Sequence, residues 1–126
     1  MTKARITVIE DDADLREAIC LMLQYEGYEA AGFSNAREAI RRLEEGHPSD
    51  LILLDLMMPV MNGWEFCDYR AAKTALARVP VIVITARRSV TPPPGVSGML
   101  LKPFDADELH GAIARVLAGS PVADGR

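Results

Sequence analysis

Short apolar runs and longer amphipathic stretches alternate along this chain. The apolar runs have the length and aliphatic composition of buried strands, and they cover residues 6–9, 51–54, 81–84 and 99–101, with a weaker run at 28–33. Between them, apolar residues recur at intervals of three and four, which predicts helices over about Asp14–Glu26, 36–46, Trp64–Leu76 and 106–117. This order predicts an α/β fold, in which helices cover both faces of a parallel sheet.

Polar residues indicate where several of these helices begin. Asn35 precedes Glu38 by three residues and Asp105 precedes Glu108 by the same spacing, which is typical of capping boxes at helix N-termini. For the first helix we expect Asp14 to be the cap, and Asp12 to be a solvated turn residue. These signals separate the predicted helices from the strands that precede them.

One segment interrupts the alternation. Between Thr85 and the last strand, where a crossover helix is expected, the chain reads Arg87-Arg88-Ser89-Val90-Thr91-Pro92-Pro93-Pro94-Gly95. Proline fixes φ and lacks a backbone N–H, so three in succession favour extended geometry and disfavour helix in the residue before them. Although parallel crossovers usually contain a helix, we expect a loop here with at most one helical turn.

The composition fits one globular domain. Of 126 residues, 49% are hydrophobic, which is enough for a sizeable core. The net charge of −4 and the scattered basic residues argue against nucleic acid as a direct partner. No apolar stretch approaches the roughly 20 residues that span a bilayer, and the N-terminus leads into a strand without a signal sequence.

Two further features concern location and boundaries. The cysteines, Cys20 and Cys67, lie in predicted helices with no spacing that suggests a disulfide, so we expect free thiols in a cytoplasmic protein. We expect residues 1–119 to form the domain, and residues 120–126 to be a disordered tail or the start of a linker.

Charged and hydroxyl residues follow the predicted strands. Glu10 and Asp11 come directly after the first strand, Asp55 follows 51–54, Thr85 follows 81–84, and Lys102 follows 99–101. The carboxyl ends of parallel strands meet at one edge of an open α/β sheet, where such folds place their chemistry. Three carboxylates, a hydroxyl and an ammonium at this edge suit a divalent cation and a phosphoryl group.

Five motifs, each weak alone but specific in this order, contain these residues: Val8-Ile9-Glu10-Asp11-Asp12, Leu54-Asp55-Leu56-Met57-Met58-Pro59, Asn62-Gly63, Val83-Ile84-Thr85-Ala86 and Lys102-Pro103-Phe104. In them the chain resembles the receiver domain of two-component response regulators, over about Arg5–Leu117. The resemblance implies a flavodoxin-like, doubly wound sheet of five parallel strands in the order 2-1-3-4-5, here with the fourth helix shortened or replaced by the Pro-rich loop. It also implies a cis peptide bond before Pro103.

The resemblance further implies a Mg²⁺ site. Asp11 and Asp55 would ligate the ion directly, Glu10 would act through water, and Met57 would contribute its backbone carbonyl. The physical chemistry agrees with this set, because crowded carboxylates raise one another's pKa and a hard cation with oxygen ligands removes that penalty.

The same resemblance implies a phosphorylation site. Asp55 would be the nucleophile that accepts a phosphoryl group, with Mg²⁺ and Lys102 neutralising charge. Thr85 would donate its hydroxyl to a phosphoryl oxygen, and the backbone N–H groups of Ala86 and Leu56 would donate as well. The donor would be a histidine kinase or a phosphotransfer protein, and the domain would switch a partner or output rather than act as an enzyme on other substrates.

Other interpretations of these residues stay open. A strand-terminal aspartate is more often a helix cap or turn residue than a nucleophile, and the acid pair could be Asp11–Asp12. The domain could also be a degenerate receiver that docks a partner without phosphorylation. A Mg²⁺-dependent phosphohydrolase is disfavoured, because such aspartate-nucleophile enzymes usually have a second acid two residues later, where this chain has Met57.

Departures from the receiver pattern concern the face used for output or dimerisation. The position three residues before the lysine is usually Tyr or Phe and here is Met99. The stretch from Thr85 to Lys102 is about five residues shorter than usual, which is more than one helical turn. We therefore expect an altered dimer face and leave the oligomeric state open. Arg70 stands where an apolar residue is expected, so it should snorkel or mark a polar contact.

Overall fold

Five parallel strands form a single sheet in the order β2-β1-β3-β4-β5. The structure is a computed structural model that describes residues 3–58, 61–87 and 89–119. The strands are β1 (Arg5–Ile9), β2 (Glu29–Phe33), β3 (Leu51–Asp55), β4 (Val81–Thr85) and β5 (Gly98–Leu101). The predicted α/β class and the order 2-1-3-4-5 are therefore confirmed. The predicted tail, residues 120–126, lies outside the described residues.

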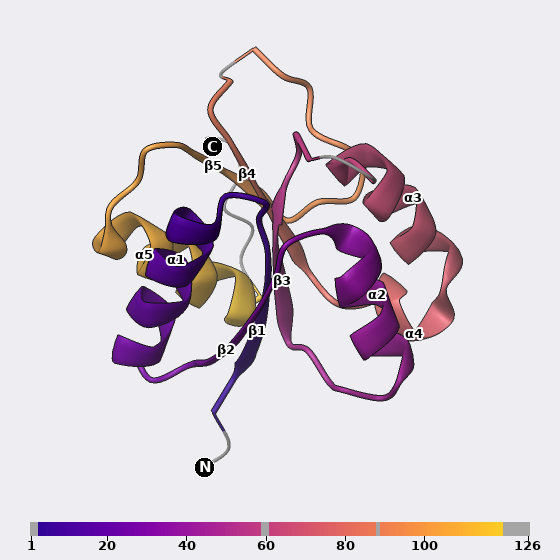
Figure 1. The fold of residues 1–126 in the computed structure, drawn as a ribbon, viewed down its shortest axis with the longest axis horizontal. Coiled ribbons are helices and arrows are strands. Elements are labelled where there is room, and N and C mark those ends of the chain that lie inside the picture. The colour runs from indigo at the N-terminus through magenta and orange to yellow at the C-terminus, as the bar shows by residue number, and fades with distance from the viewer. Residues whose placement is uncertain (1–2, 59–60, 88, 120–126) are drawn as a thin grey trace.

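Helices cover both faces of the sheet, which Figure 1 shows nearly edge-on between two layers. One layer contains α1 (Ala13–Tyr25) and α5 (Ala106–Leu117), and the other contains α2 (Ala36–Glu44), α3 (Gly63–Ala72) and α4 (Thr74–Ala77). The expected single helix over Trp64–Leu76 is thus divided into α3 and the short α4. Within the described residues, no helix is long and apolar enough to cross a membrane.

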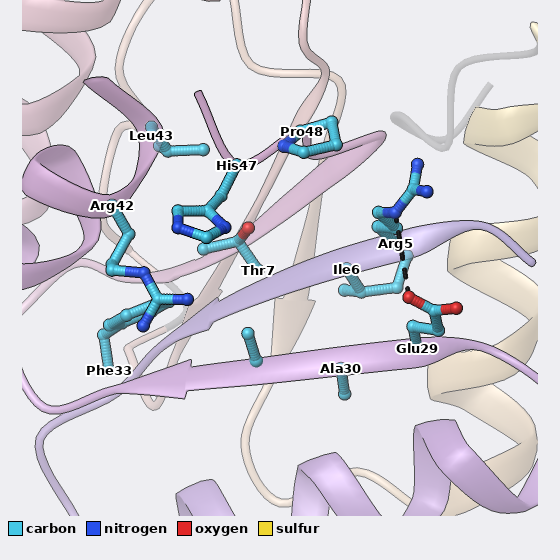
Figure 2. Close-up of a pocket in the computed structure, with 11 residues that line it drawn as sticks. Arg5, Ile6, Thr7, Glu29, Ala30, Phe33, Arg42, Leu43, His47 and Pro48 are labelled. Carbon is cyan, nitrogen blue, oxygen red and sulfur yellow. Dashed lines mark ion pairs between the residues drawn. The ribbon is translucent and has the colours of Figure 1, made fainter. Parts of the chain in front are cut away.

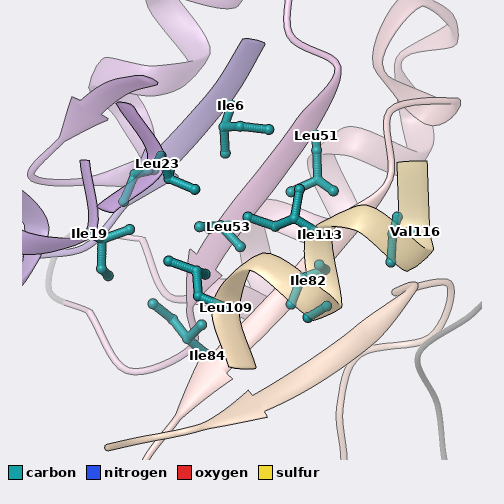
Figure 3. Close-up of a cluster of buried hydrophobic side chains, with 12 residues drawn as sticks. Ile6, Ile19, Leu23, Leu51, Leu53, Ile82, Ile84, Leu109, Ile113 and Val116 are labelled. Carbon is teal, nitrogen blue, oxygen red and sulfur yellow. The ribbon is translucent and has the colours of Figure 1, made fainter. Parts of the chain in front are cut away.

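The two central strands, β3 and β4, are buried at every position because helices cover them on both sides. Successive side chains of a strand point to opposite faces, so Leu51 and Leu53 pack with Ile82 and Ile84 beneath α1 and α5 (Figure 3). The intervening residues of both strands pack beneath α2 and α3. The core therefore holds β3 and β4 rigidly, and both strands end at the polar edge of the sheet.

Helix caps agree with the sequence in two cases and differ in one. The Asn35 side chain accepts a hydrogen bond from the Glu38 backbone N–H at 3.0 Å, and Asp105 forms a complete capping box with Glu108. For α1, the expectation that Asp14 is the cap was wrong. The helix begins at Ala13, so Asp12 is the cap, with its carboxylate accepting from the Leu15 N–H at 3.1 Å, and Asp14 lies in the first turn.

The connection between β4 and β5 contains no helix in its described residues, 86–87 and 89–97. The predicted Pro-rich loop is therefore confirmed, and Figure 1 shows it projecting beyond the carboxyl ends of the strands. Pro93 is buried, and Val90 and Val96 are partly buried against the core beneath α2 and α3. The loop also joins the sheet through the Ser97 N–H, which donates to the Val81 carbonyl at 2.7 Å.

Arg70 is buried and makes polar contacts, the second of its two predicted alternatives. Its side chain is 8% exposed. The guanidinium Nε donates to the Val79 carbonyl at 2.9 Å, and Nη2 donates to the Ala77 carbonyl at 3.0 Å. Arg70 therefore ties α3 to the segment that joins α4 to β4.

Candidate functional site

The predicted site residues meet at the carboxyl edge of the sheet. Strand register places Asp55 beside Ile84, and Thr85 beside Leu101, directly before Lys102. These side chains line a cleft of about 450 Å³, whose lining residues are Glu10, Asp11, Asp12, Asp55, Met57, Thr85, Ala86, Arg87 and Lys102. Of the residues that we predicted for the site, only Leu56 does not line the cleft.

Three carboxylates gather in this cleft. Glu10 and Asp55 are buried, with 0% and 4% of their surface exposed, whereas Asp11 is exposed. One carboxylate oxygen from each of the three lies within 4.8 Å of the other two. Such a set of hard oxygen donors, two of them shielded from solvent, is suited to a cation such as Mg²⁺. The alternative acid pair Asp11–Asp12 is not favoured, because the Asp12 carboxylate caps α1.

Lys102 lies between the two buried acids. Its Nζ is 3.0 Å from Glu10 Oε1 and 3.5 Å from Asp55 Oδ2. The backbone holds it there, because the Lys102 N–H donates to the Thr85 carbonyl at 2.8 Å, and the following bond to Pro103 is cis, as the resemblance implied. One ammonium group therefore partly compensates two carboxylates.

The electrostatics of the cleft oppose a charged Asp55. Burial, followed by the negative charge of Glu10, raises the pKa of Asp55 to about 7, although the Met57 N–H and Lys102 act against this shift. Burial also disfavours the Lys102 ammonium, but the hydrogen bond to Glu10 and the charge of Asp55 outweigh it, so the pKa of Lys102 is raised. A divalent cation would remove the excess negative charge, and the residues present fit one.

The backbone around Asp55 corrects one prediction. The Leu56 N–H donates to the Ile84 carbonyl at 3.3 Å, as part of the sheet, so it is not free to bind a phosphoryl group. The Met57 N–H instead donates to Asp55 Oδ1 at 3.1 Å. This geometry points to Met57, rather than Leu56, as the backbone donor beside the carboxylate.

Thr85 and Ala86 also line the cleft, at the end of β4, the strand that pairs with β3. Thr85 is 1% exposed, and its hydroxyl oxygen accepts a hydrogen bond from the Arg87 N–H at 3.2 Å. The hydroxyl proton is then available for an oxygen in the cleft, since a hydroxyl both accepts and donates.

Two residues that shape the site had no predicted role. Arg16, on α1, donates from Nη1 to the Glu10 carbonyl at 2.8 Å and fixes the end of β1. Gly63 begins α3, and a Cβ at this position would lie 2.6 Å from Leu56 Cδ2 and 2.8 Å from Leu56 Cα. The Asn62-Gly63 pair was visible in the sequence, but only the packing shows that this helix start requires the absence of a side chain.

The family model described as the response regulator receiver domain matches residues 6–114, which is most of the chain. The chain belongs to this family. Response regulators are signalling proteins rather than metabolic enzymes, so this receiver is a component of two-component signalling.

Individual relatives agree with this assignment. The receiver is 35% identical over 121 residues to "DNA-binding response regulator MtrA" of Mycobacterium tuberculosis, covering 92% of this chain and 50% of the relative. It is 34% identical over 125 residues to "Phosphate regulon transcriptional regulatory protein PhoB" of Escherichia coli, covering 94% and 54%. The chain thus spans about half the length of these curated relatives.

A solved structure supports the same fold. The chemotaxis response regulator CheY4 of Vibrio cholerae superposes with a TM-score of 0.82 and 28% identity, covering 91% of this chain and 99% of that one.

Proposed function

We propose that this receiver accepts a phosphoryl group on Asp55 with Mg²⁺ bound beside it. The observation that carries the proposal is the cluster around Asp55, in which two further carboxylates and the Lys102 ammonium share one cleft. Metal-free, the cluster raises the pKa of Asp55 to about 7. A bound cation would restore the carboxylate form, which is the nucleophile that phosphoryl transfer needs.

The residues divide the work as follows. Asp11 and Asp55 would hold Mg²⁺ directly, and Met57 would add its backbone carbonyl. Glu10, whose Oε1 is paired with Lys102, would act through water. When bound, the ion supplies neutralisation of the phosphoryl charge.

An Asp55 oxygen forms the new bond to phosphorus, while the bond from phosphorus to the donor's nitrogen or oxygen breaks. Lys102 would compensate the charge of the transferred group, and the Thr85 hydroxyl would donate to one of its oxygens. The N–H groups of Met57 and Ala86 would donate to others, because both residues line the cleft.

The donor is proposed from the family. Receivers interact with histidine kinases or phosphotransfer proteins, and we propose one of these as the partner here. MtrA is named as a DNA-binding regulator, but the present chain has a net charge of −4, so we propose no direct contact between this domain and nucleic acid. A cytoplasmic location stays a prediction.

Phosphorylation can be tested with a small donor. Incubated with acetyl phosphate and Mg²⁺, the wild-type chain should gain one phosphoryl group in intact-mass spectrometry, and Asp55→Asn should gain none. Asp50→Asn is the matched control, because Asp50 precedes β3 whereas Asp55 ends it. If Asp55→Asn were labelled as strongly as wild type, another residue would be the phosphoryl acceptor. No labelling of any variant would favour a docking module that does not need phosphorylation.

A further inference from the structure

A second pocket, of about 220 Å³, lies on the α2 side of the sheet and shares no residue with the acid cleft. It lies between the β1–β2 edge and the end of α2 with the segment that follows it (Figure 2). β2 is the edge strand of the sheet, and among the described residues no other strand pairs with its outer side. The pocket is therefore part of the molecular surface that the proposed function does not use.

Small side chains leave the floor of the pocket hollow. Residues at alternate positions of a strand share one face, so Thr7 of β1 faces the pocket together with Ala31, its partner in the strand register. Ala31 is exposed, although it lies under the layer that contains α2. Phe33, two residues further along β2, forms an aromatic wall at one end. A methyl group in the middle of the floor leaves room for a ligand beside that ring.

The charges around this floor are not balanced. At one end, Arg5 Nε is 3.7 Å from Glu29 Oε1, so these two side chains compensate each other. At the other end, the Arg42 guanidinium carbon lies 6.0 Å from the centre of the Phe33 ring. Arg42 Nε is buried and has no hydrogen-bond partner in the described part of the chain. His47 lies next to Arg42 in Figure 2 and offers a further polar group.

We propose that this pocket binds a small organic carboxylate through Arg42. A guanidinium presents paired N–H donors in a fork that matches a carboxylate, and Arg42, unlike Arg5 and Arg41, forms no ion pair with a carboxylate of the described residues. The Phe33 ring, Ala31 and Leu43 provide apolar surface for a short hydrocarbon body. The volume is below the 300–1,000 Å³ typical of drug-sized ligands, so the ligand is small.

A carboxylate fits better than a phosphate. A phosphate group carries close to two negative charges at pH 7, whereas the pocket has one arginine, Arg42, without an ion pair among the described residues, and it also contains Glu29. One negative charge on an apolar body matches both the charge and the lining.

Benzoate is a suitable probe, with benzamide as its neutral counterpart and inorganic phosphate as a competing anion. In ¹⁵N NMR titrations of the full chain, benzoate should shift the amide signals of Ala31, Phe33 and His47 in a saturable way. Arg42→Gln should weaken this binding by roughly tenfold or more, which is about 1.4 kcal/mol. Arg42→Lys keeps the positive charge but not the forked pair of donors, so it should weaken benzoate binding less than Arg42→Gln does. This intermediate effect would show that the loss in Arg42→Gln is not caused by unfolding. Arg41→Gln is the matched control, because Arg41 is exposed and pairs with Glu38 and Glu45.

Four outcomes would overturn the proposal. These are equal binding of benzamide, no loss of affinity in Arg42→Gln, tighter binding of phosphate at the same amides, and benzoate shifts confined to the acid cleft. The last outcome would refute the carboxylate pocket without affecting the proposed phosphorylation site, which is tested separately by the labelling of Asp55.

Discussion

Asp55 is a carboxylate whose surroundings oppose its negative charge. Burial and the Glu10 carboxylate raise its pKa to about 7, and Lys102 and the Met57 N–H only partly offset them. A group with this pKa carries a proton in the folded state at pH values where the unfolded chain has lost it. The metal-free domain should therefore show a pH dependence of stability that reports directly on this residue.

We expect the free energy of unfolding to fall as pH rises from about 4 to about 7, the interval between the ordinary and the raised pKa of Asp55. The folded state binds more protons than the unfolded state in this interval, so the slope is negative, and it vanishes above the raised pKa. Asp55→Asn cannot be charged, so at pH 8 without Mg²⁺ it should be more stable than wild type, by on the order of a few kcal/mol. Urea unfolding at pH 5 and pH 8 measures this difference.

The control for this pH effect is Asp68→Asn, which should change stability by less than about 0.5 kcal/mol at both pH values because Asp68 is exposed on α3. Added Mg²⁺ should stabilise wild type at pH 8 and should stabilise Asp55→Asn much less. If Asp55→Asn were less stable than wild type at pH 8, the carboxylate would be a structural group rather than a strained acceptor.

Most site residues could be predicted from the sequence because each one follows an apolar strand. The strand-end rule places Glu10, Asp55, Thr85 and Lys102 together without knowledge of any contact. It could not show which backbone N–H groups the sheet already uses, and this is why Leu56 was assigned the role that its neighbour Met57 can fill.

At the scale of elements, the start of α3 packs against the end of β3, which carries Asp55. The Gly63 N–H donates to the Leu56 carbonyl at 2.9 Å, and a Cβ on Gly63 would collide with the Leu56 side chain and backbone. Gly63→Ala should therefore push α3 away from the residue next to Asp55. We expect a loss of about 1–3 kcal/mol in stability and slower labelling of Asp55 by acetyl phosphate.

A second glycine serves as the control for Gly63. Gly111 lies within α5, and a Cβ there would meet no atom within 4 Å. Gly111→Ala should stabilise the domain by about 0.5–1 kcal/mol, because alanine loses less conformational entropy in a helix than glycine does, and it should leave labelling unchanged. Wild-type labelling and stability in Gly63→Ala would show that the helix adjusts without moving Asp55.

The predicted third helix is divided into α3 and α4, and Arg70 stabilises this arrangement through its hydrogen bonds to the Ala77 and Val79 carbonyls. Arg70→Met keeps an apolar stem of similar length but leaves the Ala77 and Val79 carbonyls without the guanidinium donors. We expect a loss of about 1–3 kcal/mol in urea unfolding. Arg78→Met, at an exposed position of the same segment, should stay within about 0.5 kcal/mol of wild type. Equal effects of the two substitutions would mean that the buried contacts contribute little.

The sequence could not specify the contacts of Arg70. Its partners are main-chain carbonyls seven and nine residues later, beyond a helix break that the apolar periodicity did not indicate. The helix cap at Asp12 was missed for a related reason, because Asp12 and Asp14 are both good caps and only the end of β1 decides between them.

For the whole molecule, the alternation of strands and helices along the chain was predictable because apolar periodicity records which faces are buried, whereas the order of the strands in the sheet came from the family resemblance. The one irregular crossover was also predictable, since three prolines exclude a helix by their own covalent structure. How strongly this loop is coupled to the site is a property of its packing. The Lys102 N–H donates to the Thr85 carbonyl, and this hydrogen bond links the cleft to the end of β5. Val90 and Val96 of the loop pack instead against the core beneath α2 and α3.

Activation should therefore change the cleft more than the crossover. A helix can transmit a displacement along its length, but the described residues between β4 and β5 form none, and the three prolines provide no N–H groups for new hydrogen bonds. Met99, a partly buried residue of β5 that packs against the core beneath α2 and α3, has a flexible side chain that can refill space without moving the backbone. With Mg²⁺ and beryllofluoride as a phosphoryl mimic, hydrogen exchange should slow at residues 85–87 and change little at residues 90–99.

The control is Asp55→Asn, in which the same treatment should not slow exchange at residues 85–87. Sedimentation of wild type should show no mimic-dependent dimer. Strong protection spreading through Val96–Leu101, together with such a dimer, would show that the crossover loop transmits the signal as a helix would.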